Sequence, residues 1–172
     1  FQKAGAFKLR GAGNAILSLD EKEARNGVVT HSSGNHAQAV SFAARLRGIP
    51  AYIVMPSNSS KAKMAAVKGY GGEISLCDAT HSSREDTAHR IMTEKNACMI
   101  HPYDDYRIIA GQGTIAKEIY EVSTGIDYLL VPVSGGGLIS GNALSTRYLS
   151  PKTRVIGCEP KNADDAYRSL QE

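Results

Sequence analysis

The chain has 172 residues, with 20 Lys and Arg against 17 Asp and Glu, and its net charge of +3 is too small and too scattered to indicate nucleic-acid binding. It contains no apolar run long enough for a membrane span and no basic-then-apolar leader, so we expect no membrane association. Three isolated cysteines argue against a disulfide scaffold or a zinc site and predict a reducing, cytoplasmic compartment. Because the chain begins at Phe1 and stops soon after a strand-turn-helix pattern, we expect a piece of a longer protein that lacks both ends.

Short apolar runs alternate with longer amphipathic segments along the chain. We predict strands at 27–31, 51–55, 73–77, 97–101, 128–133 and 154–159, and helices at 35–47, 61–70, 82–95, 105–123 and 138–149. Runs such as Leu129-Leu130-Val131 are typical of strands covered by helices on both faces of a sheet. The repeated β-α-β pattern predicts an α/β fold with parallel sheets. The polar stretch 101–106 interrupts this pattern and predicts a crossing between two lobes.

A glycine-rich segment, Ser134-Gly135-Gly136-Gly137-Leu138, follows a strong strand and opens a helix. Adjacent glycines let backbone N–H groups approach an anion, and a helix N-terminus favours negative charge, so we predict phosphate binding. Gly135, Gly137 and Gly141 also fit a loosened dinucleotide fingerprint, with Glu159 near the place of a ribose-binding acid. On spacing alone, a nicotinamide-binding domain therefore stays open.

Three further segments carry chemistry that none of them establishes alone. His31-Ser32-Ser33-Gly34-Asn35-His36 lies between a strand and a helix, where hydroxyls and free amides can hold a carboxylate. In Gly5-Ala6-Phe7-Lys8-Leu9-Arg10-Gly11, apolar neighbours can lower the pKa of a lysine and make its amine nucleophilic. Glu159-Pro160-Lys161-Asn162-Ala163-Asp164-Asp165 offers oxygen ligands to a hard divalent cation.

Together and in this order, these segments resemble the serine racemase and serine/threonine dehydratase family of pyridoxal-phosphate enzymes, which shares its fold with the tryptophan synthase β chain. The resemblance runs from residue 1 to 172, and Ser134-Gly135-Gly136-Gly137 and His101-Pro102-Tyr103-Asp104-Asp105 look most like plant members. It implies two lobes with parallel sheets flanked by helices. The large, incomplete cofactor lobe is expected at 1–26 and 105–172, and the small substrate lobe at 27–104.

The resemblance implies a role for each matching residue. Lys8 is expected to be linked through its amine to pyridoxal 5'-phosphate and to move a proton on one face of the substrate, while Ser33 matches the acid/base of the other face. Cofactor contacts are expected from Phe7, Lys8, Asn35, Ser134, Gly135, Gly136, Gly137 and Leu138. Substrate contacts are expected from Ser32, Ser33, Asn35, His36 and Arg84.

The same resemblance implies two effector sites. Mg²⁺, with Ca²⁺ or Mn²⁺ as substitutes, is expected at Glu159, the Ala163 carbonyl and Asp165. The positions where animal members bind an activating nucleotide, ATP, are matched by Lys3, Ala4 and Tyr70. Ala4 stands where threonine is common in the family, and this departure argues against nucleotide activation.

The implied activity is the interconversion of L- and D-serine, with β-elimination of serine to pyruvate and ammonia. A first alternative is an L-serine/L-threonine or hydroxyaspartate dehydratase with little racemisation. A more remote one is an NAD-binding domain or a non-catalytic fragment. We expect an amino-acid substrate, a homodimer, and neither a nucleic-acid nor a membrane partner.

Overall fold

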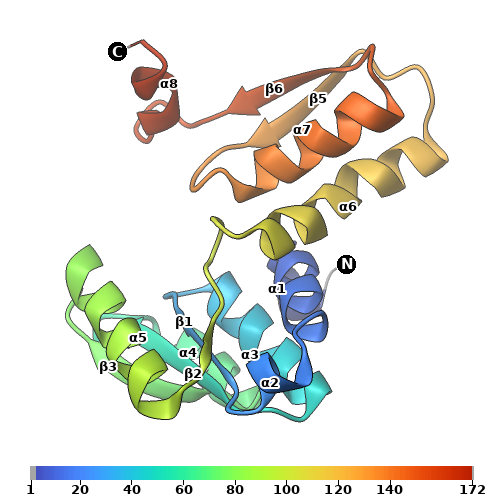
Figure 1. The fold of residues 1–172 in the computed structure, drawn as a ribbon. Coiled ribbons are helices and arrows are strands. Elements are labelled where there is room, and N and C mark those ends of the chain that lie inside the picture. Colours follow the sequence, from blue (N-terminus) through green and yellow to red (C-terminus); the bar gives the residue numbers. More distant parts are fainter. Residues whose placement is uncertain (1–2, 172) are drawn as a thin grey trace.

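The computed structural model describes residues 3–171 and contains two parallel sheets flanked by helices (Figure 1). The first sheet has the strand order β3-β2-β1-β4 and the second pairs β5 with β6. The strands are β1 (Val28–His31), β2 (Ala51–Pro56), β3 (Glu73–Cys77), β4 (Cys98–Met99), β5 (Tyr128–Pro132) and β6 (Arg154–Cys158). Each lies where the apolar runs predicted a strand, and the parallel α/β fold is confirmed.

The helices comprise the predicted ones and several that the sequence analysis missed. The predicted helices are α3 (Asn35–Arg47), α4 (Lys61–Gly69), α5 (His81–Lys95), α6 (Tyr106–Val122) and α7 (Gly137–Leu149). The missed segments are the 3-10 turn η1 (Lys3–Gly5), α1 (Lys8–Leu17) and α2 (Glu21–Ala24). The last helix, α8 (Asp165–Ser169), is the helix of the strand-turn-helix pattern expected near the end of the chain. Within residues 3–171, no helix is both long and apolar enough to cross a lipid bilayer.

Helix α1 escaped prediction because Gly11 and Gly13 lower its intrinsic helix propensity, although Gly11 is needed for packing. A Cβ on Gly11 would lie 2.3 Å from Nε2 of Gln112, and one on Gly111 would lie 2.4 Å from the carbonyl oxygen of Arg10. The backbones of α1 and α6 therefore approach closely only because glycine stands on both sides. This contact fixes the start of α1, and with it Lys8, against α6.

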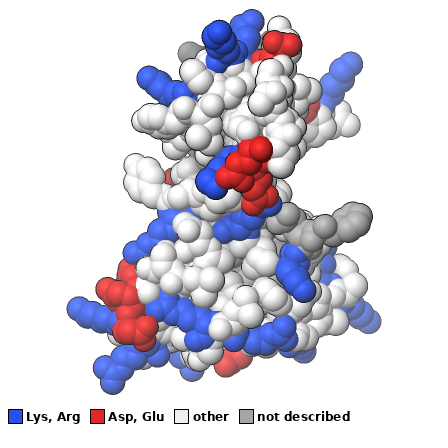
Figure 2. Space-filling model, turned by 90° about the vertical axis from the view of Figure 1, so that its right-hand side faces the viewer, with Lys and Arg blue, Asp and Glu red and all other residues white. Residues whose placement is uncertain are grey.

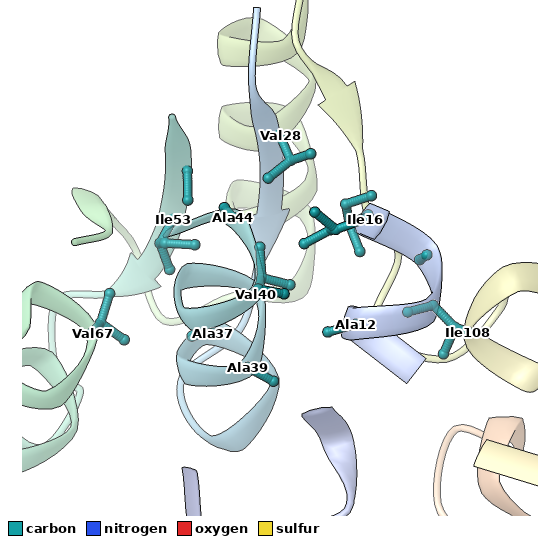
Figure 3. Packing of buried hydrophobic residues seen from close by; sticks show 14 of the residues in the cluster. Ala12, Ile16, Val28, Ala37, Ala39, Val40, Ala44, Ile53, Val67 and Ile108 are labelled. Carbon is teal, nitrogen blue, oxygen red and sulfur yellow. The ribbon is translucent and has the colours of Figure 1, made fainter. Parts of the chain in front are cut away.

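Two hydrophobic clusters cover the two faces of the first sheet. On β1, Val28 belongs to one cluster and Val29 to the other, as the alternation of side chains along a strand requires. The larger cluster joins α1, α3 and the sheet, with Ile16, Val40 and Ile53 fully buried in it (Figure 3). The smaller cluster lies beneath α5.

The second sheet is smaller and packs against α7. Its strands pair in register, so that Leu130 lies beside Ile156, and both side chains are exposed together with Tyr128. A space-filling view shows a narrow waist between the part that holds this sheet and the part that holds the first (Figure 2). The two sheets fall into the two predicted lobes, but α1 packs against both α3 and α6, and the lobe boundaries stay a prediction.

Candidate active site

Lys8 is the first residue of α1, and its side chain is largely enclosed. Its Nζ donates a hydrogen bond to the carbonyl oxygen of Pro102 at 2.7 Å and lies 5.4 Å from the centre of the Phe7 ring. Burial removes water from the ammonium and lowers the pKa of Lys8 below its ordinary value. A larger fraction of the amine is therefore neutral and able to attack a carbonyl carbon.

The glycine-rich segment forms the turn between β5 and α7. Gly136 has a φ of 86°, which is in the left-handed region that favours glycine. A Cβ on Gly135 would lie 2.3 Å from Cδ1 of Tyr103, and one on Gly137 would lie 2.6 Å from the Tyr103 carbonyl oxygen. The turn thus stays free of side chains where Tyr103 touches it, and the first N–H groups of α7 remain available to an anion.

Lys8 and the glycine turn line one cavity of about 210 Å³. Its walls are Phe7, Lys8, Tyr103, Pro132, Val133, Ser134, Gly135, Gly136, Gly137 and Leu138. All the predicted cofactor residues except Asn35 are in this set. A nucleophilic amine and an amide-rich turn in one cavity fit the aldehyde and the phosphate of pyridoxal phosphate.

Ser33 and Arg84 line a separate cavity of about 320 Å³. Lys63 of α4 also borders it, and its Nζ lies 3.6 Å from the place of a Cβ on Gly34. Of the described residues that line this cavity, two are cationic and none is acidic. The cavity is therefore suited to an anionic group, and Lys63 is a lining residue that the sequence analysis did not single out.

The start of α3 holds the other predicted substrate residues. Ser32 Oγ accepts a hydrogen bond from the N–H of Gly34 at 3.2 Å, and Asn35 is exposed. His36 is buried, with Nε2 3.3 Å from the carbonyl oxygen of Ile100 and no partner for Nδ1 among residues 3–171. Burial, and then the nearby charge of Lys8, lower the pKa of His36 to about 3, so its ring is neutral. Its substrate contact stays a prediction.

One of the predicted cation ligands, Glu159, is engaged with the start of α8. Glu159 accepts hydrogen bonds from the N–H groups of Ala166 at 3.2 Å and Tyr167 at 2.9 Å, which stabilises the start of α8. Asp165 is the first residue of that helix, and the N–H of Ala163 donates to the carbonyl oxygen of Pro160. In the described part of the chain, no three His, Cys, Asp or Glu side chains gather into a cation site.

The residues expected to contact a nucleotide lie along α3. Lys3 and Ala4 form η1, which contacts α3, and Ala4 has a left-handed φ of 59°. The ring of Tyr70 packs edge-on against Phe42 at 5.5 Å and near the guanidinium of Arg45 at 5.6 Å. Tyr70 thus has a packing role of its own, whereas Lys3 is exposed.

Sequence reasoning gave His101, Pro102 and Tyr103 no place in the site. In the structure, the Pro102 carbonyl accepts a hydrogen bond from the Lys8 amine, and the Tyr103 ring packs against Gly135. The available signal was the polar interruption at 101–106, which the pattern marked as a crossing.

A lysine made nucleophilic by burial, next to an amide-rich turn on parallel α/β layers, is the arrangement expected of an enzyme that binds a phosphorylated aldehyde. Residues 1–172 match the family described as "Pyridoxal-phosphate dependent enzyme", and the chain belongs to that family. The predicted fold type is confirmed by this match, and it removes the support for a nicotinamide-binding domain.

Within this family, the chain is similar to known racemases and dehydratases. A serine racemase of Arabidopsis thaliana is 56% identical over 168 residues, which are 98% of this chain and 51% of that protein. A beta-hydroxyaspartate dehydratase of Paracoccus denitrificans (strain Pd 1222) is 52% identical over 171 residues, covering 99% of this chain and 54% of that protein. The solved structure of maize serine racemase superposes with a TM-score of 0.97 at 51% identity, covering 99% of this chain and 52% of that one. The chain therefore spans about half the length of these relatives.

Proposed function

We propose that the full-length protein is a pyridoxal-phosphate-dependent serine racemase that also converts serine to pyruvate and ammonia by β-elimination. The observation that carries this proposal is the single cavity in which the Lys8 amine and the turn at 134–138 meet. The 56% identity to a serine racemase supports the choice of reaction.

In this proposal the residues of the chain bind the cofactor at both ends. Lys8 attaches through its amine, the ring of Phe7 lies against that site, and Asn35 bonds the ring hydroxyl. The amides of 134–138 hold the phosphate, whose negative charge the N-terminus of α7 favours. When bound, the cofactor withdraws electrons from the substrate Cα and makes its proton removable.

Two proton-transfer groups are needed to invert the substrate carbon. Lys8, once its amine is released, removes the proton on one face, and its lowered pKa leaves more of the amine in the neutral form that can accept a proton. Ser33 returns a proton on the other face. Because the two residues line different cavities, we propose that closure of the small lobe onto the large one brings Ser33 to the substrate and excludes water.

Replacing Ser33 tests this division of labour in the full-length enzyme. Ser33→Ala is expected to abolish the formation of D-serine, measured by chiral separation, while pyruvate formation from L-serine continues. Ser60→Ala is the matched control, because Ser60 lines the same cavity and makes no side-chain cap bond. Equal loss of both products in Ser33→Ala would show that Ser33 does not serve one face alone.

A specific observation favours a second candidate, a hydroxyaspartate dehydratase. The cavity at Ser33 is bordered by Lys63 and Arg84 without an acidic partner in its walls, which suits a substrate with a second carboxylate. One of the similar proteins, at 52% identity, carries this activity in its name. Comparison of kcat/KM on serine and on 3-hydroxyaspartate decides between the two.

We also propose an Mg²⁺ site at Glu159, the Ala163 carbonyl and Asp165. Carboxylate and carbonyl oxygens are ligands that Mg²⁺ prefers, but Glu159 must first give up its amide bonds to α8. We assign no proton-transfer step to this ion. A rise in melting temperature on adding Mg²⁺, absent in Glu159→Gln, would support the site.

The remaining finer expectations are proposals as well. They are nucleotide binding at Lys3, Ala4 and Tyr70, a homodimer, and a cytoplasmic location. The rings of Tyr106 on α6 and Tyr148 on α7 are exposed and border an apolar hollow of about 420 Å³, the surface that a second copy would cover in this proposal.

A further inference from the structure

The segment between β4 and α6 supplies two groups to the cavity that holds Lys8. The carbonyl oxygen of Pro102 accepts a hydrogen bond from Lys8 Nζ at 2.7 Å. The next residue, Tyr103, rests its ring on Gly135 and its backbone on Gly137. The position of this short segment therefore sets both the direction of the amine and the shape of the glycine turn.

One side chain ties this segment together. Nδ1 of His101 accepts hydrogen bonds from the N–H groups of Tyr103 at 3.3 Å and Asp104 at 2.8 Å. The His101 ring also packs edge-on against the Tyr103 ring at 4.6 Å. At the far end of the segment, Asp105 accepts from two amides at the start of α6. Pro102 thus lies within the turn that the hydrogen bonds from Tyr103 and Asp104 to His101 close.

The bonding pattern requires one form of the imidazole. A nitrogen that accepts from two N–H groups carries no proton, so His101 must be neutral with its proton on Nε2. Burial lowers the pKa of His101, and the charge of Lys8 acts in the same direction, whereas the carboxylates of Asp104, Glu85 and Asp105 raise it.

The surroundings also show what protonation would do. The rings of His31 and Tyr103 pack against His101, at 6.0 Å and 4.6 Å between ring centres. A proton on Nδ1 would face two N–H donors, and both hydrogen bonds to the segment would be lost.

We propose that His101 is a positioning residue, whose Nδ1 holds the 101–104 segment so that Pro102 aims the Lys8 amine and Tyr103 closes the glycine turn. With one N–H of the amine held by Pro102, its lone pair is directed away from that carbonyl. His101 is not itself among the residues that line the cofactor cavity, and it acts on the cavity through Tyr103, which lines it. This role rests on the proposed attachment of the cofactor at Lys8.

Two readouts on the full-length enzyme test the proposal. By ¹⁵N NMR of the imidazole, His101 is expected to carry its proton on Nε2, and the amides of Tyr103 and Asp104 are expected to exchange slowly. In His101→Ala these amides should exchange faster, and kcat/KM should fall by on the order of 10²-fold, as for a catalytic group displaced by about 1 Å. In His101→Asn, the side-chain oxygen can accept hydrogen bonds from the same N–H groups but does not titrate, so much of the activity should return. The acid limb that His101 contributes to the pH profile should disappear in this variant.

His81→Ala is the matched control, because His81 belongs to the same row of rings through His31 but pairs with Glu85 instead of the segment. A proton on Nδ1, or unchanged exchange and an unchanged pH profile in His101→Ala, would overturn the proposal. If wild-type enzyme bound no cofactor at Lys8 while the NMR and exchange results held, the proposed function would fail and the structural part of this inference would stand.

Discussion

Replacement of Gly135 by Ala tests how the cofactor cavity is built. The added Cβ would lie 2.3 Å from Cδ1 and Cγ and 2.6 Å from Cε1 of Tyr103. These atoms belong to the root and side of the ring, and the ring is further held by its contact with His101 at 4.6 Å. Tyr103 therefore cannot move aside as the end of a long, flexible side chain could.

The overlap must appear either as lost stability or as a changed cavity. Overpacking of this kind costs about 1–3 kcal/mol, which corresponds to a factor of about 5 to 150 in an equilibrium constant. If the glycine turn and Tyr103 move apart, the cofactor must restore their positions, and its Kd rises by that factor. If they stay in place, the free energy of unfolding falls by the same amount.

The assay combines a fluorescence titration of the cofactor-free, full-length protein with urea unfolding. Gly13→Ala is the matched control, since no atom lies within 4 Å of the Cβ it adds to α1. That variant should keep the wild-type Kd and gain about 0.5–1 kcal/mol of stability, because alanine is the better helix former. Wild-type Kd and wild-type stability together in Gly135→Ala would refute the reasoning.

Two further predictions concern the buried histidine and the second cavity. The pKa of His36 is about 3 in the fold against 6.5 in the unfolded chain, so below pH 6.5 only the unfolded chain gains the proton, and stability falls as the pH drops from 6.5 toward 3. At pH 5 this lowers the free energy of unfolding by about 2 kcal/mol. Urea unfolding at pH 7 and pH 5 should show that His36→Gln loses less stability between these pH values than wild type does. Equal losses would contradict the burial argument. Lys63→Ala should lower kcat/KM for 3-hydroxyaspartate about 10-fold more than for serine, because one charged contact is lost. Lys68→Ala, on the same helix, is the control and should not show this difference. Equal effects on both substrates would show that Lys63 does not select the substrate.

The strands were predictable because buried parallel strands carry continuous apolar runs. Leu129-Leu130-Val131 fell within β5, and the glycine turn was recognised from its place between that strand and α7. Helix α1 was not recognised, since Gly11 is explained by its contacts with Ile108 and Gln112 of α6, which lie far away in the sequence. Local periodicity carries no information on such a contact.

The candidate site was predictable to a similar degree. Lys8 was singled out by the family resemblance, because its spacing alone gave no reason to prefer it over Lys3. Its partner Pro102 lies 94 positions away and contributes a backbone carbonyl, a group that every residue has. The engagement of Glu159 by α8 was likewise invisible, because a capping carboxylate and a metal-binding carboxylate have the same sequence signature.

The most direct measurement of the central claim is the location of the cofactor on the protein. The full-length enzyme, reduced with borohydride and digested, should yield one peptide with the mass of the reduced pyridoxal-phosphate adduct, and fragmentation should place that adduct on Lys8. An adduct on another lysine, or none on a protein with full activity, would contradict the account.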